Sequence, residues 1–111
     1  MYMESVFEFI DYRQFLNHYY YVKKAETRYF SFRYFANKAG INSSSFLKHV
    51  IDGRRNLTPV ACVQFCAALG LDGKQATYFR HLVMFNQART AAAILNVSRP
   101  QARQYKRKAM P

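Results

Sequence analysis

The sequence SFRYFANKAGINSSSFLKHVIDG, at residues 31–53, decides the fold of this chain. Ser31 is a residue type that caps helices, and apolar side chains follow it at helical spacing over residues 32–39. Gly40 comes next, and glycine tolerates the positive φ with which a helix often ends. The stretch therefore begins with a short helix that stops at Gly40.

A second short helix is expected over residues 44–52, after a tight turn. Ser43 or Ser44 is the expected N-cap, and Gly53 supplies the left-handed residue that ends the helix. Its expected buried side consists of Phe46, Leu47, Val50 and Ile51. The small Ala36 in the first helix leaves room for the second helix to cross it. Two short helices joined in this way indicate a helix-turn-helix.

Further helices are expected on both sides of this unit. A capping-box pattern at Asp11 starts a helix over residues 11–25. The pair Thr58-Pro59 is a strong helix start, and a second capping box at Asp72 opens a helix that ends near Ala88. No strand pair and no internal repeat is evident in the sequence. The expected fold is all-α, a compact bundle of about five helices that contains the helix-turn-helix.

The two ends of the chain differ from this helical part. Residues 1–10 are expected to form an N-terminal arm that packs its aromatic side chains on the helices, and residues 11–90 the helical domain. Residues 91–111 are expected to hold a separate short helix over 91–95, capped by Thr90, and then a basic tail. The tail from Arg99 onward has five basic residues, no acidic one and few apolar side chains to bury, so a frayed or disordered tail is expected rather than a docked element.

The charge of the chain is unevenly distributed. Lys and Arg number 17 against 6 Asp and Glu, which gives a net charge of +11. Residues 1–30 contain four basic and four acidic residues, whereas residues 31–111 contain thirteen basic residues and only Asp52 and Asp72. Such an excess favours a polyanionic partner. Charge alone is equally compatible with a basic surface that has no specific ligand.

Several classes of protein do not fit this sequence. No uninterrupted apolar run is longer than that of Ala91–Leu95, which is far below the roughly 18 residues of a membrane-spanning helix, so no membrane partner is expected. Acidic Glu4 and Glu8 do not fit an export signal, and two cysteines form no disulfide framework, so a cytoplasmic location is expected. The sequence has none of the HExxH, GxSxG, phosphate-loop or dinucleotide-binding motifs, so neither an enzyme nor a cofactor is expected.

The two cysteines, Cys62 and Cys66, lie four residues apart on one expected helix. This spacing binds a metal only if two further ligands face it, and the three histidines are scattered along the chain. Buried free thiols in an apolar helix are the preferred interpretation.

Residues 31–70 resemble a Cro/C1-type, lambda-repressor-like helix-turn-helix domain. The resemblance lies in the run ANKAGI at 36–41, the loop DGRR at 52–55 and the closing AALGL at 67–71. Three further runs are similar to the N-terminal region of a family of uncharacterised bacterial proteins, namely DYRQFL at 11–16, VIDGRRNL at 50–57 and FNQA at 85–88. This second resemblance covers about residues 5–90. Residues 91–111 do not match the longer helical C-terminal region of that family.

The resemblance implies that the helix over residues 44–52 enters the major groove of double-stranded DNA. The residues implied to contact base edges are Ser44, Ser45, Lys48 and His49. The residues implied to contact phosphate are Arg33, Lys38, Ser43, Arg54 and Arg55. The alternative for each of these side chains is a solvated surface position without a ligand.

The chain is therefore expected to be a sequence-specific DNA-binding protein, a bacterial transcription regulator that reads the major groove. A homodimer is an open option, since such domains usually read paired half-sites, although the sequence has no zipper-like heptad. The alternative function is a protein-interaction module that keeps the helix-turn-helix scaffold without reading DNA. The two differ in one property, which is binding of the isolated chain to duplex DNA.

Overall fold

The computed structural model of the protein describes the backbone of residues 5–98 and the side chains of residues 5–90. This part of the chain is all-α and has no strand. It contains, in chain order, the 3-10 helix η1 (Val6–Glu8) and the α-helices α1 (Tyr12–Glu26), α2 (Phe32–Ala39), α3 (Phe46–Ile51), α4 (Pro59–Leu69) and α5 (Gly73–Ser98). The expected class and the expected five-helix bundle are thus confirmed, whereas the basic tail beyond Ser98 lies outside the described residues.

Most helices begin at a side chain that caps the free N–H groups of the first turn. The Asp11 carboxylate accepts from the N–H of Arg13, and the hydroxyls of Ser31 and Thr58 accept from N–H groups three residues later. Asp72 and Gln75 form a reciprocal capping box, with bonds of 2.9 and 3.0 Å. These starts depend on neighbouring residues alone, and all four helices begin where the sequence predicts, although Asp11 caps α1 through Arg13 and the predicted capping box with Gln14 does not form.

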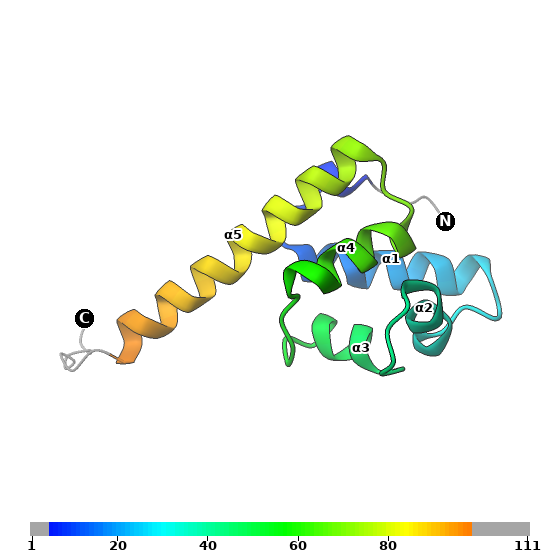
Figure 1. Cartoon of the computed structure of the whole chain (residues 1–111), viewed down its shortest axis with the longest axis horizontal. Coiled ribbons are helices and arrows are strands. Elements are labelled where there is room, and N and C mark those ends of the chain that lie inside the picture. Colours follow the sequence, from blue (N-terminus) through cyan, green and yellow to red (C-terminus); the bar gives the residue numbers. More distant parts are fainter. Residues whose placement is uncertain (1–4, 99–111) are drawn as a thin grey trace.

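Large aromatic side chains fill the core between the helices. Phe15 of α1 contacts Phe79 of α5 edge to face at 6.0 Å, and Phe35 of α2 contacts Phe65 of α4 at 5.1 Å. In the N-terminal segment, the ring of Phe7 packs on Tyr78 and that of Phe9 on Phe15. The segment therefore closes the bundle at the first half of α5 (Figure 1).

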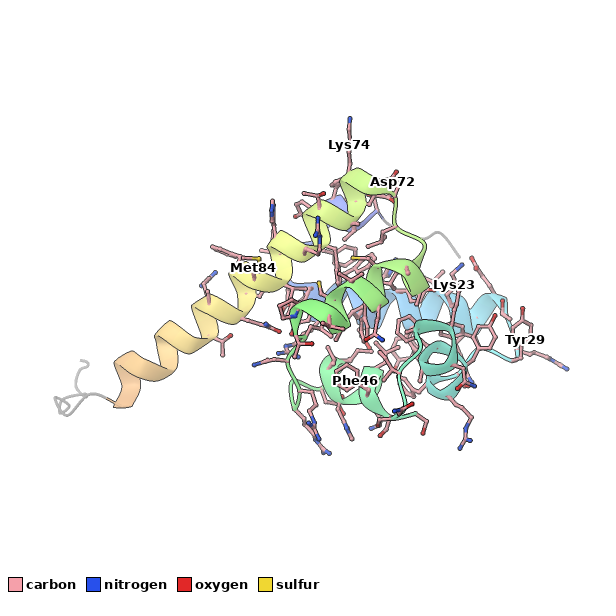
Figure 2. All side chains as sticks on the ribbon, in the orientation of Figure 1. Lys23, Tyr29, Phe46, Asp72, Lys74 and Met84 are labelled. Atoms are coloured by element: carbon pink, nitrogen blue, oxygen red, sulfur yellow. The ribbon has the colours of Figure 1, made fainter. Side chains whose placement is uncertain are left out.

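Helices α2 and α3 form a helix-turn-helix on the side of the bundle that lies away from α5 (Figure 1). Gly40 ends α2 with a φ of 74°, and the N–H of Ile41 returns to the carbonyl of Ala36. Leu47 and Val50 of α3 are buried, while Phe46 and Ile51 are half-buried at the edge of the core. The ring of Phe46 meets Phe65 of α4 at 5.8 Å, and Figure 2 labels Phe46 on α3.

The start of α3 corrects one prediction. The helix begins at Phe46, so the predicted helix over residues 44–52 is too long, and Ser44 and Ser45 precede it. Ser45 is the N-cap, but its side chain makes no capping hydrogen bond. Three consecutive serines offer equivalent caps, so packing of Phe46 and Leu47 against the core decides where the helix starts.

The C-terminal helix corrects a second prediction. Helix α5 continues without a break from Gly73 to Ser98, so the predicted separate helix over residues 91–95 is wrong. The hydroxyl of Thr90 donates to the carbonyl of Asn86 at 3.0 Å instead of capping a new helix. The second half of α5 extends beyond the rest of the bundle (Figure 1). None of the helices within residues 5–98 combines the length and the apolar content that crossing a membrane requires.

Candidate nucleic-acid interface

The candidate site is the exposed surface of α2, the following turn, α3 and the loop to residue 55, here called the α2–α3 face. The four predicted base-contact residues lie on or beside the first turns of α3. Ser44 and Lys48 are exposed, and Ser45 and His49 are half-buried. Because Leu47 and Val50 occupy the opposite side of the same helix and are buried, the polar side of α3 points to solvent.

The predicted phosphate-contact residues lie on α2, in the turn before α3 and in the loop after it. Side chains of all five are exposed, namely Arg33 and Lys38 on α2, Ser43 in the turn, and Arg54 and Arg55 after α3. Residues 31–55 contain five basic residues against the single acidic Asp52. Figure 2 shows side chains tipped with nitrogen projecting outward from the part of the molecule that contains α3. The predicted residues are therefore accessible to solvent on the elements that form the α2–α3 face, which has a net positive charge.

The end of α3 is a short turn with defined hydrogen bonds. Gly53 has a φ of 86°, and the N–H groups of Arg54 and Arg55 both donate to the carbonyl of His49, at 2.8 and 3.2 Å. This carbonyl is one of the last in the helix and would otherwise have no partner inside it. The backbone of the two arginines is thus fixed while their side chains remain in solvent.

Arg13 of α1 is a residue of this site that the sequence did not indicate. Its guanidinium donates to the carbonyl of Val50, to the carbonyl of Arg55 at 3.0 Å and to the side-chain oxygen of Asn56 at 2.8 Å. It thereby connects the last turn of α3 and the following loop to α1. The partners lie 37 to 43 positions away in the sequence, so no local pattern could have revealed the role.

A second exposed surface lies between α4 and α5. Helix α4 has no charged residue, and its outer side exposes Val60 (70%) and Val63 (58%). Met84 of α5 is 67% exposed, and it lines, together with Val63, a groove of about 340 Å³ between the two helices. An apolar surface of this kind, here called the α4–α5 face, is typical of a contact with another macromolecule.

The two thiols are buried inside α4, as the sequence predicted. A hydrogen bond with Cys66 and burial both raise the pKa of Cys62, which keeps that thiol protonated and unreactive. Within residues 5–90, no three His, Cys, Asp or Glu side chains come together in a way that would hold a metal ion. The thiols therefore act as small apolar residues of the core.

No family model, no curated protein and no solved structure matches this chain. The resemblance to Cro/C1-type domains accordingly stays an expectation drawn from the sequence. The ligand of the α2–α3 face has to be inferred from its shape, its charge and its side chains.

Proposed function

We propose that the protein binds double-stranded DNA through the α2–α3 face and acts as a cytoplasmic transcription regulator of bacteria. One observation carries the proposal: Ser44, in the turn before α3, and Lys48, on α3, are exposed within a surface that contains five basic residues and a single acidic one. A short helix with an exposed polar side within a cationic surface is the arrangement that contacts base edges and phosphates.

The size of α3 is compatible with this role. An α-helix with its side chains is about 10–12 Å in diameter and the major groove is about 12 Å wide, so α3 can enter it, and its six residues extend for about 9 Å. Lys48 suits the O6 and N7 acceptors of guanine, whereas serine hydroxyls bond to several bases. His49 is half-buried and reaches the groove only from its edge.

The experiment is a selection of bound duplexes from a random pool at physiological salt, followed by affinity measurements at several salt concentrations. If Arg33, Lys38, Arg54 and Arg55 each neutralise one phosphate, the logarithm of the affinity should fall with the logarithm of salt with a slope of roughly −4. A pool without enriched sequences, or an affinity that does not change with salt, would contradict the proposal.

The α4–α5 face supports a second candidate function, a protein-interaction module whose partner is a second copy of the chain. The exposed side chains Val60, Val63 and Met84 fit a small contact, less than the ~800 Å² per partner of a standard interface. Two copies would present two α3 helices to paired half-sites, which joins this candidate to DNA reading. Sedimentation equilibrium of the chain and of Val63→Lys tests it, since only the unaltered chain should dimerise.

A further inference from the structure

Three runs that are far apart in the sequence meet at one hydrogen-bonded junction in the structure. They are residues 11–16 at the start of α1, residues 50–57 at the end of α3 and the following loop, and residues 85–88 in α5. All three carry the resemblance to the second bacterial family, but the proposed contacts with DNA involve only a part of one of them. The hydrogen bonds within the junction indicate what the other parts do.

Gln87 of α5 holds the loop that follows α3. Its side-chain oxygen accepts from the N–H of Leu57 at 2.8 Å, and its side-chain nitrogen donates to the carbonyl of the same residue at 3.2 Å. The same oxygen accepts from the hydroxyl of Tyr12 at 2.9 Å. Leu57 and Tyr12 are buried, so these groups have lost their contact with water and depend on Gln87.

Asn86 acts in a similar way on the start of α1. Its side-chain oxygen accepts from the N–H of Tyr12 at 2.9 Å, and its nitrogen donates to the carbonyl of Ile10 at 3.1 Å. The N–H of Tyr12 is one of the groups that a helix leaves unpaired at its N-terminus. Two consecutive amides of α5 thus connect this helix to α1 and to the loop after α3.

Arg13 completes the junction from α1. Its positively charged guanidinium donates to the carbonyls of Val50 and Arg55 and to the side-chain oxygen of Asn56, at the end of α3 and in the following loop. The guanidinium also lies over the ring of Tyr12, at 4.8 Å from the centroid. Arg13 is half-buried and its nitrogens donate to protein oxygens. It therefore connects α1 to the end of α3 and to the loop that contains Arg54 and Arg55.

Helix α3 needs such a support. Six residues are too few for a helix to be stable through its own hydrogen bonds, and one side of α3 faces solvent. Its orientation is therefore set by the burial of Leu47 and Val50 and by the contacts at its C-terminal end. Arg13 makes these contacts directly, and Gln87 holds the loop two residues further along.

We propose that Arg13 and Gln87 are positioning residues for DNA reading. They hold α3 and the loop of Arg54 and Arg55 in the orientation in which the α2–α3 face meets the duplex, and they do so without touching DNA. This inference rests on the proposed function and extends the machinery of recognition to α1 and α5.

The test compares Arg13→Lys and Gln87→Ala with the unaltered chain. Lysine keeps the positive charge but does not reproduce the several directed bonds of a guanidinium, and alanine removes the amide without a change in charge. Arg28→Lys and Gln14→Ala are the matched controls, because both side chains are exposed. Circular dichroism confirms that each variant is folded. Each is then titrated at several salt concentrations with a duplex selected by the unaltered chain and with an unrelated duplex of equal length.

Both positioning variants should bind the selected duplex about tenfold more weakly, as expected for the loss of hydrogen bonds to charged or buried groups. Their affinity for the unrelated duplex and their salt slope should stay the same, because the number of charges on the α2–α3 face is unchanged. Folded variants that discriminate as well as the unaltered chain overturn the proposal. Normal binding by Arg13→Lys, together with a smaller salt slope for Arg13→Ala, would make Arg13 a direct phosphate ligand and also overturn it.

Amide hydrogen exchange without DNA is the second measurement. The N–H groups of Arg54 and Arg55 should exchange faster in both positioning variants, while those of α4 should not change. If these N–H groups exchange at the same rate in the variants as in the unaltered chain, and the unaltered chain binds DNA, the inference is overturned and the proposed function is not. An unaltered chain that binds no duplex overturns the proposed function and the inference that rests on it.

Discussion

Lys48 and Asp52 form an ion pair on the exposed side of α3, with 3.6 Å between Nζ and Oδ2. Their side chains are 55% and 38% exposed, and they lie one helical turn apart. The order of the two residues, with lysine before the acid, is the less stabilising one for a helix. The pair therefore contributes little to stability. It does engage the ammonium group of Lys48, a predicted base-contact residue, with the one acidic residue of the α2–α3 face.

Replacing Asp52 with asparagine should strengthen binding to duplex DNA about threefold, the order of magnitude of one exposed ion pair. The change removes a negative charge that would repel phosphate, and it frees the ammonium group of Lys48. Fluorescence anisotropy with a labelled duplex measures the affinity. Glu8→Gln in η1 is the matched control, since it removes the same charge far from α3. Equal or weaker binding by Asp52→Asn would contradict this prediction.

Lys48 and Arg55 should differ in what their loss does to DNA binding. Lys48→Ala should lower affinity for the selected duplex by about 1–3 kcal/mol and relax the preference at one position of the site, because a base contact is lost. Arg55→Ala should weaken binding to all duplexes alike and reduce the salt slope by about 1, because a phosphate contact is lost. Titrations of several single-base variants at two or more salt concentrations separate the two effects. Equal, sequence-independent losses in both variants would leave only non-specific binding.

The hydroxyl of Tyr12 should contribute measurably to stability. Its hydrogen bond to Gln87 lies inside the bundle, and Tyr12→Phe removes this bond while Gln87 still accepts from Leu57. The expected loss in the free energy of unfolding is about 1 kcal/mol. Urea denaturation measures it, with Tyr21→Phe as the control, because the side chain of Tyr21 is exposed. A variant at position 12 as stable as the control would show that the bond contributes nothing.

The same hydroxyl should make stability depend on pH. Burial raises the pKa of Tyr12 from its ordinary value of 10.0 to about 12, although the neighbouring Arg13 cation acts in the opposite direction. The unfolded chain therefore releases this proton at a lower pH than the folded protein does. The resulting stabilisation is complete below pH 10 and is lost as the pH rises from 10 to about 12.

The difference in unfolding free energy between the unaltered chain and Tyr12→Phe isolates this effect from other groups that titrate in alkali. This difference should decrease as the pH rises from 10 to about 12, as measured by urea denaturation at a series of pH values. A constant difference would show that the hydroxyl has the same pKa in both states.

Two glycine substitutions should have opposite effects on stability. Gly40→Ala forces a φ of 74° on a residue with a Cβ atom, which costs about 1–2 kcal/mol. The new Cβ would lie 3.9 Å from Nε2 of Gln64, an ordinary contact, so the loss comes from the backbone alone. Gly73, the first residue of α5, has no positive φ, and a Cβ atom added there would meet no other atom within 4 Å. Gly73→Ala should therefore stabilise the folded protein by about 0.5 kcal/mol. Denaturation of both variants under one set of conditions tests the contrast, and a loss of stability in both would contradict it.

Local chemistry made much of the fold predictable. Helices α2, α4 and α5 start after Ser31, Thr58 and Asp72 as the sequence indicates, because each cap is made within three residues. Gly40 ends α2 for the same reason, since a positive φ is a property of one residue. The exposed basic residues were predictable as well, because charged side chains on a short amphipathic helix remain in solvent.

The two errors arose where local signals were ambiguous. Three serines precede α3, and each has the side chain of a cap, so only the packing of Phe46 against Phe65 selects the start. Thr90 is also a cap residue by type, but inside a continuing helix its hydroxyl bonds back to the carbonyl of Asn86.

By itself, the sequence determined that the chain is all-α, where most helices begin, and which cationic side chains surround α3, because capping and helical periodicity involve residues within about one turn. Only the tertiary structure decided that Arg13 and Gln87 contact the end of α3 and the loop behind it, and that Asn86 connects α5 to the start of α1. Their partners lie up to 76 positions away, and hydrogen bonds over such separations depend on how whole helices pack. The contacts that orient the predicted reading helix are therefore a product of the fold.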